Sequence, residues 1–229
     1  MKIIDKILNQ GEYYTDVCPK NTIYLHHTAG GHNPVYAMDG WNHDKTKAGG
    51  QLKVATAYLI GGISTYDKDI SFDGIIYRAF DDKYWAHHLG THLLINESLN
   101  KQSIAIEICN YGPLTKNSAG QFINYIGKQV PPQMVTTLDK PFRGFIHFHK
   151  YTDKQLIALE ELVRFLGDKY KINLKAGLQQ FINSGASAFE INAAAQKGLS
   201  GVWSHTNVID QGKWDLYPCP RIIEMIKRF

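Results

Sequence analysis

The feature that most constrains the fold is the alternation of short apolar runs with one strongly amphipathic segment. Residues 22–25, 56–63 and 103–109 have the composition of buried strands, and the near-continuous apolar character of 103–109 predicts a central strand. Thr152 and Gln155 form a capping-box pattern, and the apolar residues after it recur at helical spacing: Leu156, Leu159, Val163, Leu166 and Tyr170. Strands interleaved with helices predict an α/β fold in which helices flank a mixed central β-sheet.

Length and charge limit the number of domains and the kinds of partner. A chain of 229 residues with 44% hydrophobic content can bury one core, so we expect a single domain over residues 1–229. The net charge of +4 lacks the clustered basic stripe of nucleic-acid-binding proteins, and we expect no nucleic-acid partner. This charge suits an anionic polymer, and it is equally compatible with an ordinary solvated surface.

The cysteines, the apolar runs and the first residues exclude further classes. Three cysteines cannot form a disulfide framework, and they lack metal-ligand spacing. No run approaches the roughly 18–20 apolar residues that a membrane helix requires. The first residues do not have the pattern of a signal peptide, because charges interrupt any apolar stretch. We expect a monomer without a membrane partner that stays in the cytoplasm after synthesis unless another factor releases it.

A motif near the C-terminus carries the strongest chemical signal. His205 and Asp215 are residue types that bind zinc, and Lys213 lies between them as a fixed positive charge. Catalytic zinc sites use three nitrogen or oxygen ligands and leave a fourth position for water, so a distant third ligand is needed. His26 and His27 follow a predicted strand and are the first place to look for it. Because side chains alternate along a strand, only one of the two histidines can face a given site.

Together these motifs resemble the type 2 N-acetylmuramoyl-L-alanine amidases, a zinc-dependent family that includes phage amidases and peptidoglycan-recognition proteins. The resemblance extends from about residue 22 to residue 220 and implies the family's mixed α/β fold. It implies that His26, His205 and Asp215 bind Zn²⁺, with Asp215 where some members have cysteine. It also implies that Glu107 and Lys213 are catalytic residues.

Two further segments match the family pattern. Tyr58 matches a tyrosine that borders the zinc ion in the family, and the resemblance places it among the catalytic residues. Trp85, His88 and Asn100 resemble a Trp-His-x-Gly…Asn segment beside the substrate groove, with the His-x-Gly spacing favouring His88 over His87. Residues 1–21 form an N-terminal extension of the family domain.

Residues 110–150 depart from the short loop of the family and predict an inserted, β-rich segment on the rim. His147 and His149 alternate along this segment. We interpret them by default as surface or packing histidines, since a metal site would need a third ligand.

The resemblance implies hydrolysis of the amide between N-acetylmuramic acid and L-alanine in peptidoglycan. Glu107 would transfer the proton of the attacking water, Lys213 would stabilise the oxyanion, and Tyr58 would orient the water or the carbonyl. Structural interpretations stay open: Glu107 as a buried carboxylate paired with Lys213, Tyr58 as a core aromatic, and Asp215 as a helix cap.

Several functional alternatives also stay open. A recognition module that binds peptidoglycan without cutting it is one, although all three ligand positions are filled. A zinc peptidase is another, although the chain has no His-Glu-x-x-His motif. For the amidase itself, we expect a lytic, phage-type enzyme that acts on the bacterial cell wall after release. A cytoplasmic enzyme that recycles muropeptides is the alternative role.

Overall fold

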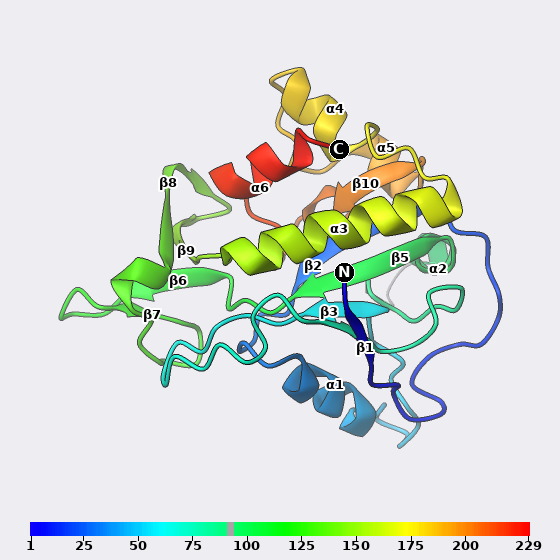
Figure 1. Ribbon diagram of the computed structural model, residues 1–229, viewed down its shortest axis with the longest axis horizontal. Coiled ribbons are helices and arrows are strands. Elements are labelled where there is room, and N and C mark those ends of the chain that lie inside the picture. Colours follow the sequence, from blue (N-terminus) through cyan, green and yellow to red (C-terminus); the bar gives the residue numbers. More distant parts are fainter. Residues whose placement is uncertain (91–93) are drawn as a thin grey trace.

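The fold is built on a six-stranded mixed sheet, seen in a computed structural model that describes residues 1–90 and 94–229 (Figure 1). The strand order is β1-β4-β3-β5-β2-β10. The strands are β1 (Ile3–Asp5), β2 (Thr22–His27), β3 (Tyr58–Ile60), β4 (Ile76–Arg78), β5 (Ser103–Ile108) and β10 (Gly201–Ser204). β3 and β4 pair antiparallel, and the other neighbours in this order pair parallel. The structure therefore confirms the predicted α/β class with a mixed central sheet.

The two central strands carry the residues that matter most for the site. All six residues of β2 are buried, and Glu107 is the only residue of β5 that is not fully buried. The register places His26 opposite Glu107 and Tyr58 opposite Ile106. Because side chains alternate across a strand and paired neighbours share a face, His26 and Glu107 lie on one face of the sheet and Tyr58 on the other.

Helix α3 (Asp153–Tyr170) lies across one face of the sheet (Figure 1). Its N-terminus has the predicted capping box: the Thr152 hydroxyl accepts from the Gln155 backbone, and the Gln155 side chain accepts from the Thr152 backbone. The other helices are α1 (Pro34–His43), α2 (Leu94–Lys101), α4 (Leu178–Asn183), α5 (Ala193–Gln196) and α6 (Pro220–Ile226), with 3-10 turns η1 (Pro132–Met134) and η2 (His205–Asn207). No helix in the described ranges has both the length and the apolar composition of a membrane span.

A second sheet projects to one side of the central sheet (Figure 1). It is antiparallel with the order β7-β6-β9-β8 and consists of β6 (Pro113–Lys116), β7 (Phe122–Ile123), β8 (Val135–Phe142) and β9 (Phe145–His149). Residues 110–150 are thus rich in β-structure, as the sequence indicates.

The N-terminal residues join the central sheet. β1 pairs parallel with β4, and Asp5 accepts two hydrogen bonds from the guanidinium of Arg78, at 2.8 and 2.9 Å. Residues 1–21, expected as an extension, therefore supply one of the two edge strands of the sheet, β1.

Candidate metal and catalytic site

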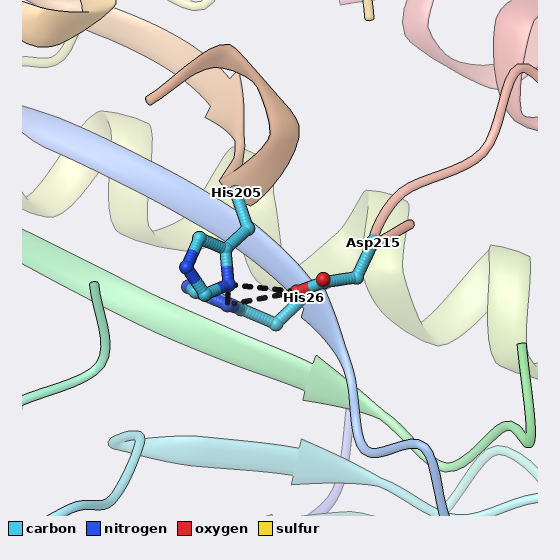
Figure 2. Close-up of side chains that lie close together, drawn as sticks. All are labelled: His26, His205 and Asp215. Carbon is cyan, nitrogen blue, oxygen red and sulfur yellow. Dashed lines mark hydrogen bonds and ion pairs between the residues drawn. The ribbon is translucent and has the colours of Figure 1, made fainter. Parts of the chain in front are cut away.

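His26, His205 and Asp215 converge at the edge where β2 and β10 end (Figure 2). β10 pairs parallel with β2, so both strands deliver a histidine at their carboxyl ends: His26 in β2 and His205 directly after β10. Asp215 lies in the loop that follows His205. The backbone N–H of Thr206 donates to the carbonyl of Asp215 at 3.0 Å and so holds this loop next to His205. Short parallel pairing thus brings together residues that lie far apart in the sequence.

The three side chains present one atom each to a common point. The Nδ1 atoms of His26 and His205 are 3.0 Å apart, and Asp215 Oδ2 lies 2.9 Å from His205 Nδ1 and 3.2 Å from His26 Nδ1. Zinc bonds of about 2.0–2.2 Å in a regular tetrahedron place neighbouring ligand atoms roughly 3.3–3.6 Å apart. Two imidazoles and one carboxylate are also a donor set typical of catalytic zinc. The residues present therefore fit a zinc ion with an open fourth position.

Protonation in this cluster also suits a cation. Burial lowers the pKa of His26 to about 4, and the neighbouring His205 adds to this shift. Burial would raise the pKa of Asp215, but the charge of His205 and hydrogen bonds from both histidines outweigh it, so this pKa lies well below its ordinary value. His26 is thus neutral and Asp215 ionised near pH 7, which are the states in which both residues ligate metals.

The neighbouring His27 points elsewhere, as alternation along β2 requires. Its Nδ1 lies 3.0 Å from the hydroxyl of Tyr151, which precedes α3. His26, and not His27, therefore lies together with His205 and Asp215.

A cavity of about 550 Å³ opens onto this cluster. Glu107 and Lys213 line it together with the three cluster residues. One wall comes from the second sheet and its flanks, with Tyr111, Pro113, Thr115, Ile123, Tyr125 and Phe145, and Trp214 lies beside Lys213. The cavity thus combines a polar floor with a largely apolar wall.

Glu107 lacks the structural partner that would make it inert. Its Oε2 atom is buried and has no hydrogen-bond partner among the described residues, so Oε2 forms no ion pair with Lys213. Burial raises the pKa of Glu107 well above its ordinary value; the Asp215 charge adds to the rise and Lys213 opposes it. Such a carboxyl group in a cavity is a candidate for proton transfer.

The structure does not bring Tyr58 to this cavity, which corrects the expectation that it borders the metal. Its hydroxyl donates to Asp82 Oδ2 at 2.8 Å. Asp82 is fully buried and also accepts from Lys169 and Tyr170 of α3, at 2.7 and 2.6 Å. Tyr58 therefore belongs to a polar network on the α3 face, opposite the face of His26 and Glu107.

Of the three residues expected beside the substrate groove, only His88 lines the cavity. Trp85 is 4% exposed and stacks on Tyr14, with ring centroids 3.9 Å apart. Asn100 is 1% exposed, and its Oδ1 accepts from the backbone N–H groups of His88 and Leu89, both at 3.0 Å. Trp85 and Asn100 thus support the backbone behind the cavity, which corrects their expected contact with substrate.

His88 is hydrogen-bonded through both ring nitrogens. Its Nδ1 lies 3.1 Å from His26 Nε2, and its Nε2 lies 2.7 Å from Ser103 Oγ. His87 lines the cavity as well, but its Nε2 faces the hydroxyl of Tyr14 at 3.3 Å. His88, which the His-x-Gly spacing favours, therefore contacts His26 and has no ring nitrogen free to bind substrate.

The two histidines of β9 have packing roles. His147 Nδ1 lies 3.0 Å from Thr137 Oγ1, and His149 Nδ1 accepts from the backbone N–H of Tyr111 at 3.2 Å. Among the described residues, neither histidine belongs to a group of potential metal ligands.

Arg143 is a residue that sequence reasoning missed. It lies in the turn between β8 and β9, where Arg143 and Gly144 have φ values of 46° and 87°. Its guanidinium donates to four backbone carbonyls, at 2.8 to 3.0 Å: Thr206, Ile209, Asp210 and Lys213. Its own carbonyl accepts from the indole of Trp214 at 3.2 Å. The second sheet thereby holds the loop that carries Lys213, and a lone arginine in a turn gives no sequence signal of this.

Comparison with known proteins places the chain in a family. The family model described as N-acetylmuramoyl-L-alanine amidase matches residues 17–218. No curated protein matches the chain. Among solved structures, PlyL is 14% identical with a TM-score of 0.47, and the match covers 94% of this chain and 86% of PlyL.

Two other solved structures are similar. The amidase LysC from Clostridium intestinale URNW is 14% identical with a TM-score of 0.45, over 100% of this chain and 96% of LysC. The E. coli amidase AmiD, solved with anhydro-N-acetylmuramic acid-L-Ala-D-gamma-Glu-L-Lys, is 19% identical with a TM-score of 0.39, over 76% of this chain and 60% of AmiD. Since these TM-scores are below 0.5, the assignment rests on the family model, and the chain belongs to the type 2 N-acetylmuramoyl-L-alanine amidase family.

Proposed function

We propose that this protein is a zinc-dependent amidase that hydrolyses the bond between N-acetylmuramic acid and L-alanine in peptidoglycan. The observation that carries the proposal is the convergence of His26, His205 and Asp215, within 3.2 Å of one another, beside a cavity that also holds Glu107 and Lys213. The substrate class in this proposal follows from the family membership, and the choice of zinc follows from the two imidazoles and the carboxylate.

His26, His205 and Asp215 would hold the zinc ion. When bound, zinc polarises the scissile carbonyl and lowers the pKa of water toward about 7. All three proposed ligands are at most 7% exposed, so solvent water has little access to their side chains and does little to disturb their positions.

Glu107 would take the proton of the attacking water and deliver it to the leaving amine. Its unpartnered Oε2 supports this role, because a carboxylate committed to a structural ion pair could not exchange protons with substrate. Its position opposite His26 in the sheet fixes the carboxyl group on the cluster's face. Positioned acid–base groups typically contribute about 10²–10⁴-fold to the rate.

Lys213 would stabilise the negative charge that develops on the carbonyl oxygen. It lines the cavity close in sequence to Asp215, and Arg143 holds its backbone carbonyl at 2.9 Å. Removing one such donor costs about 10²–10³-fold in kcat.

The second sheet would form the substrate-contacting wall. Ile123, Tyr125 and Phe145 line the cavity that the cluster residues also line. Sugar rings and lactyl groups have apolar faces that pack well on aromatic side chains. This wall gives residues 110–150 a role in binding the glycan or the stem peptide.

The test is digestion of purified peptidoglycan, with the products identified by mass spectrometry. Release of intact stem peptides that begin with alanine, lost in His205→Ala, would support the amidase. Shortened peptides would indicate a zinc peptidase instead, and binding without any release would indicate a recognition module. Faster cleavage of the polymer than of soluble muropeptides would support a lytic role, and the reverse preference a recycling role.

A further inference from the structure

Trp214 lies between two residues of the proposed catalytic site. Its neighbours in the chain are Lys213 and Asp215, and its side chain lines the cavity that both of these residues line. The Trp214 ring is partly buried and packs against the hydrophobic core, so part of it is fixed by packing while part borders the cavity. A side chain in this place lies close to any bond that the site cleaves.

Two further contacts fix the orientation of the Trp214 indole. Its N–H donates to the carbonyl of Arg143 at 3.2 Å. Its ring meets the ring of Phe145 edge to face, with centroids 5.7 Å apart and an angle of 88° between the ring planes. Phe145 lines the same cavity and also packs against the core. We call the side chains of Trp214 and Phe145 the aromatic corner.

The aromatic corner offers the cavity only apolar surface. The indole N–H is the one conventional hydrogen-bonding group of a tryptophan side chain, and in Trp214 it is bound to the Arg143 carbonyl. The side chain of Phe145 has no such group. The corner therefore favours a part of the substrate whose contact surface consists of C–H groups, because polar groups buried against it would lose their hydrogen bonds to water.

The two sides of the proposed scissile bond differ in this respect. The stem peptide has backbone N–H and C=O groups at every residue, and burial of these groups against an apolar surface without partners costs free energy. The pyranose ring of N-acetylmuramic acid presents C–H groups on its faces, while its hydroxyl groups lie around the ring edge and can stay in water. A sugar face can therefore stack on an aromatic ring without loss of hydrogen bonds.

We propose that Trp214, supported by Phe145, binds the muramyl sugar by stacking on the ring that carries the lactyl group of the scissile amide. The inference rests on the proposed amidase function. It assigns to the sugar a part of the cavity wall for which that function allows either glycan or stem peptide. The enzyme should therefore distinguish its substrates by the sugar as well as by the peptide.

The direct test is to titrate the protein with each half of the substrate and to follow the NMR signal of the Trp214 indole N–H. Loss of one of the four tryptophan indole signals in Trp214→Phe identifies it. The disaccharide N-acetylglucosaminyl-N-acetylmuramic acid, which carries no peptide, should shift this signal saturably, and the dipeptide L-Ala-γ-D-Glu should not. No shift with the disaccharide, or an equal or larger shift with the dipeptide, would overturn the proposal.

Hydrolysis of two matched substrates measures the contribution of the aromatic ring. Both contain L-Ala-D-isoglutamine; one carries N-acetylmuramic acid, and the other carries O-methyl-D-lactate, which keeps the scissile amide but lacks the sugar. An aromatic contact typically contributes roughly 2- to 10-fold beyond the area that it buries. We expect Trp214→Leu to lower the ratio of kcat/KM for the first substrate over the second by roughly this factor, mainly through KM, and Trp214→Phe to keep most of the ratio. An unchanged ratio in Trp214→Leu would refute sugar stacking on Trp214.

These measurements separate the inference from the proposed function. If the wild type hydrolyses neither substrate, the amidase proposal fails, and the response of the Trp214 signal to the disaccharide still decides the inference. If the wild type hydrolyses both substrates with the same ratio as Trp214→Leu, the amidase stands and the assignment of the sugar to Trp214 is wrong. The NMR titration uses the wild-type protein, so it decides the question even if Trp214→Leu does not fold.

Discussion

Substitution of Arg143 tests whether the second sheet organises the site. Arg143→Met keeps the apolar stem but removes the guanidinium that donates to Thr206, Ile209, Asp210 and Lys213. Nη1 has two hydrogens for three of these carbonyls, so about three full bonds are lost. Each is partly or fully exposed to solvent and worth a net of roughly 0.5–1.5 kcal/mol, so we expect a local cost of about 2–4 kcal/mol.

Hydrogen exchange of the loop amides measures this cost. Val208 and Ile209 donate to the carbonyl of His205, at 3.0 and 3.1 Å, and their amides open with the loop. A cost of about 2–4 kcal/mol predicts exchange faster by roughly 30- to 1,000-fold, together with a lower kcat because Lys213 loses its position. Arg143→Lys keeps the charge but not the planar guanidinium, so its amide exchange rates should lie between those of the wild type and Arg143→Met. Unchanged exchange of both amides in Arg143→Met would show that the Arg143 guanidinium does not hold the loop.

Three further predictions address single residues. Glu107→Gln should bind zinc like the wild type but lose about 10²–10⁴-fold in kcat, and retention of near-normal turnover would exclude proton transfer by Glu107. Tyr58→Phe should leave hydrolysis unchanged while lowering the free energy of unfolding by about 1–3 kcal/mol in urea titrations, because buried Asp82 loses a donor; a selective loss of activity would return Tyr58 to the site. Burial lowers the pKa of His149 to about 3, whereas in the unfolded chain the pKa of this side chain is near its ordinary value of 6.5. The contribution of neutral His149 to the free energy of unfolding is therefore complete above pH 6.5 and falls as the pH drops toward 3, since the unfolded state binds the extra proton. In urea titrations from pH 7 to 4, the free energy of unfolding should fall less steeply with pH in His149→Phe than in the wild type. An equal dependence on pH in both proteins would show that His149 does not make this contribution.

The sequence carries the information on the sheet and the metal ligands because both leave local traces. Burial on both faces makes 103–108 almost continuously apolar, and the strand ends place His26 and His205 in recognisable motifs. Parallel pairing of β2 with β10 then brings the two histidines together without further information.

The errors arise where a residue's role depends on register or on distant backbone. Tyr58 lies one position before the residue opposite Glu107, and this single step puts its side chain on the α3 face. Trp85 and Asn100 match a family segment, but Trp85 is buried against Tyr14 and Asn100 is hydrogen-bonded to the backbone of His88. Arg143 binds carbonyls 63 to 70 positions away, which no local pattern reveals.

The most direct test of the proposed function is to follow peptidoglycan hydrolysis while zinc is removed with a chelator and then added back. We expect that the release of alanine-terminated stem peptides falls with the zinc content and returns as the protein regains about one zinc ion per chain. His205→Ala should neither hold that ion nor recover activity. Undiminished release from protein stripped of zinc would contradict the assignment of His26, His205 and Asp215 as the ligands of a catalytic metal.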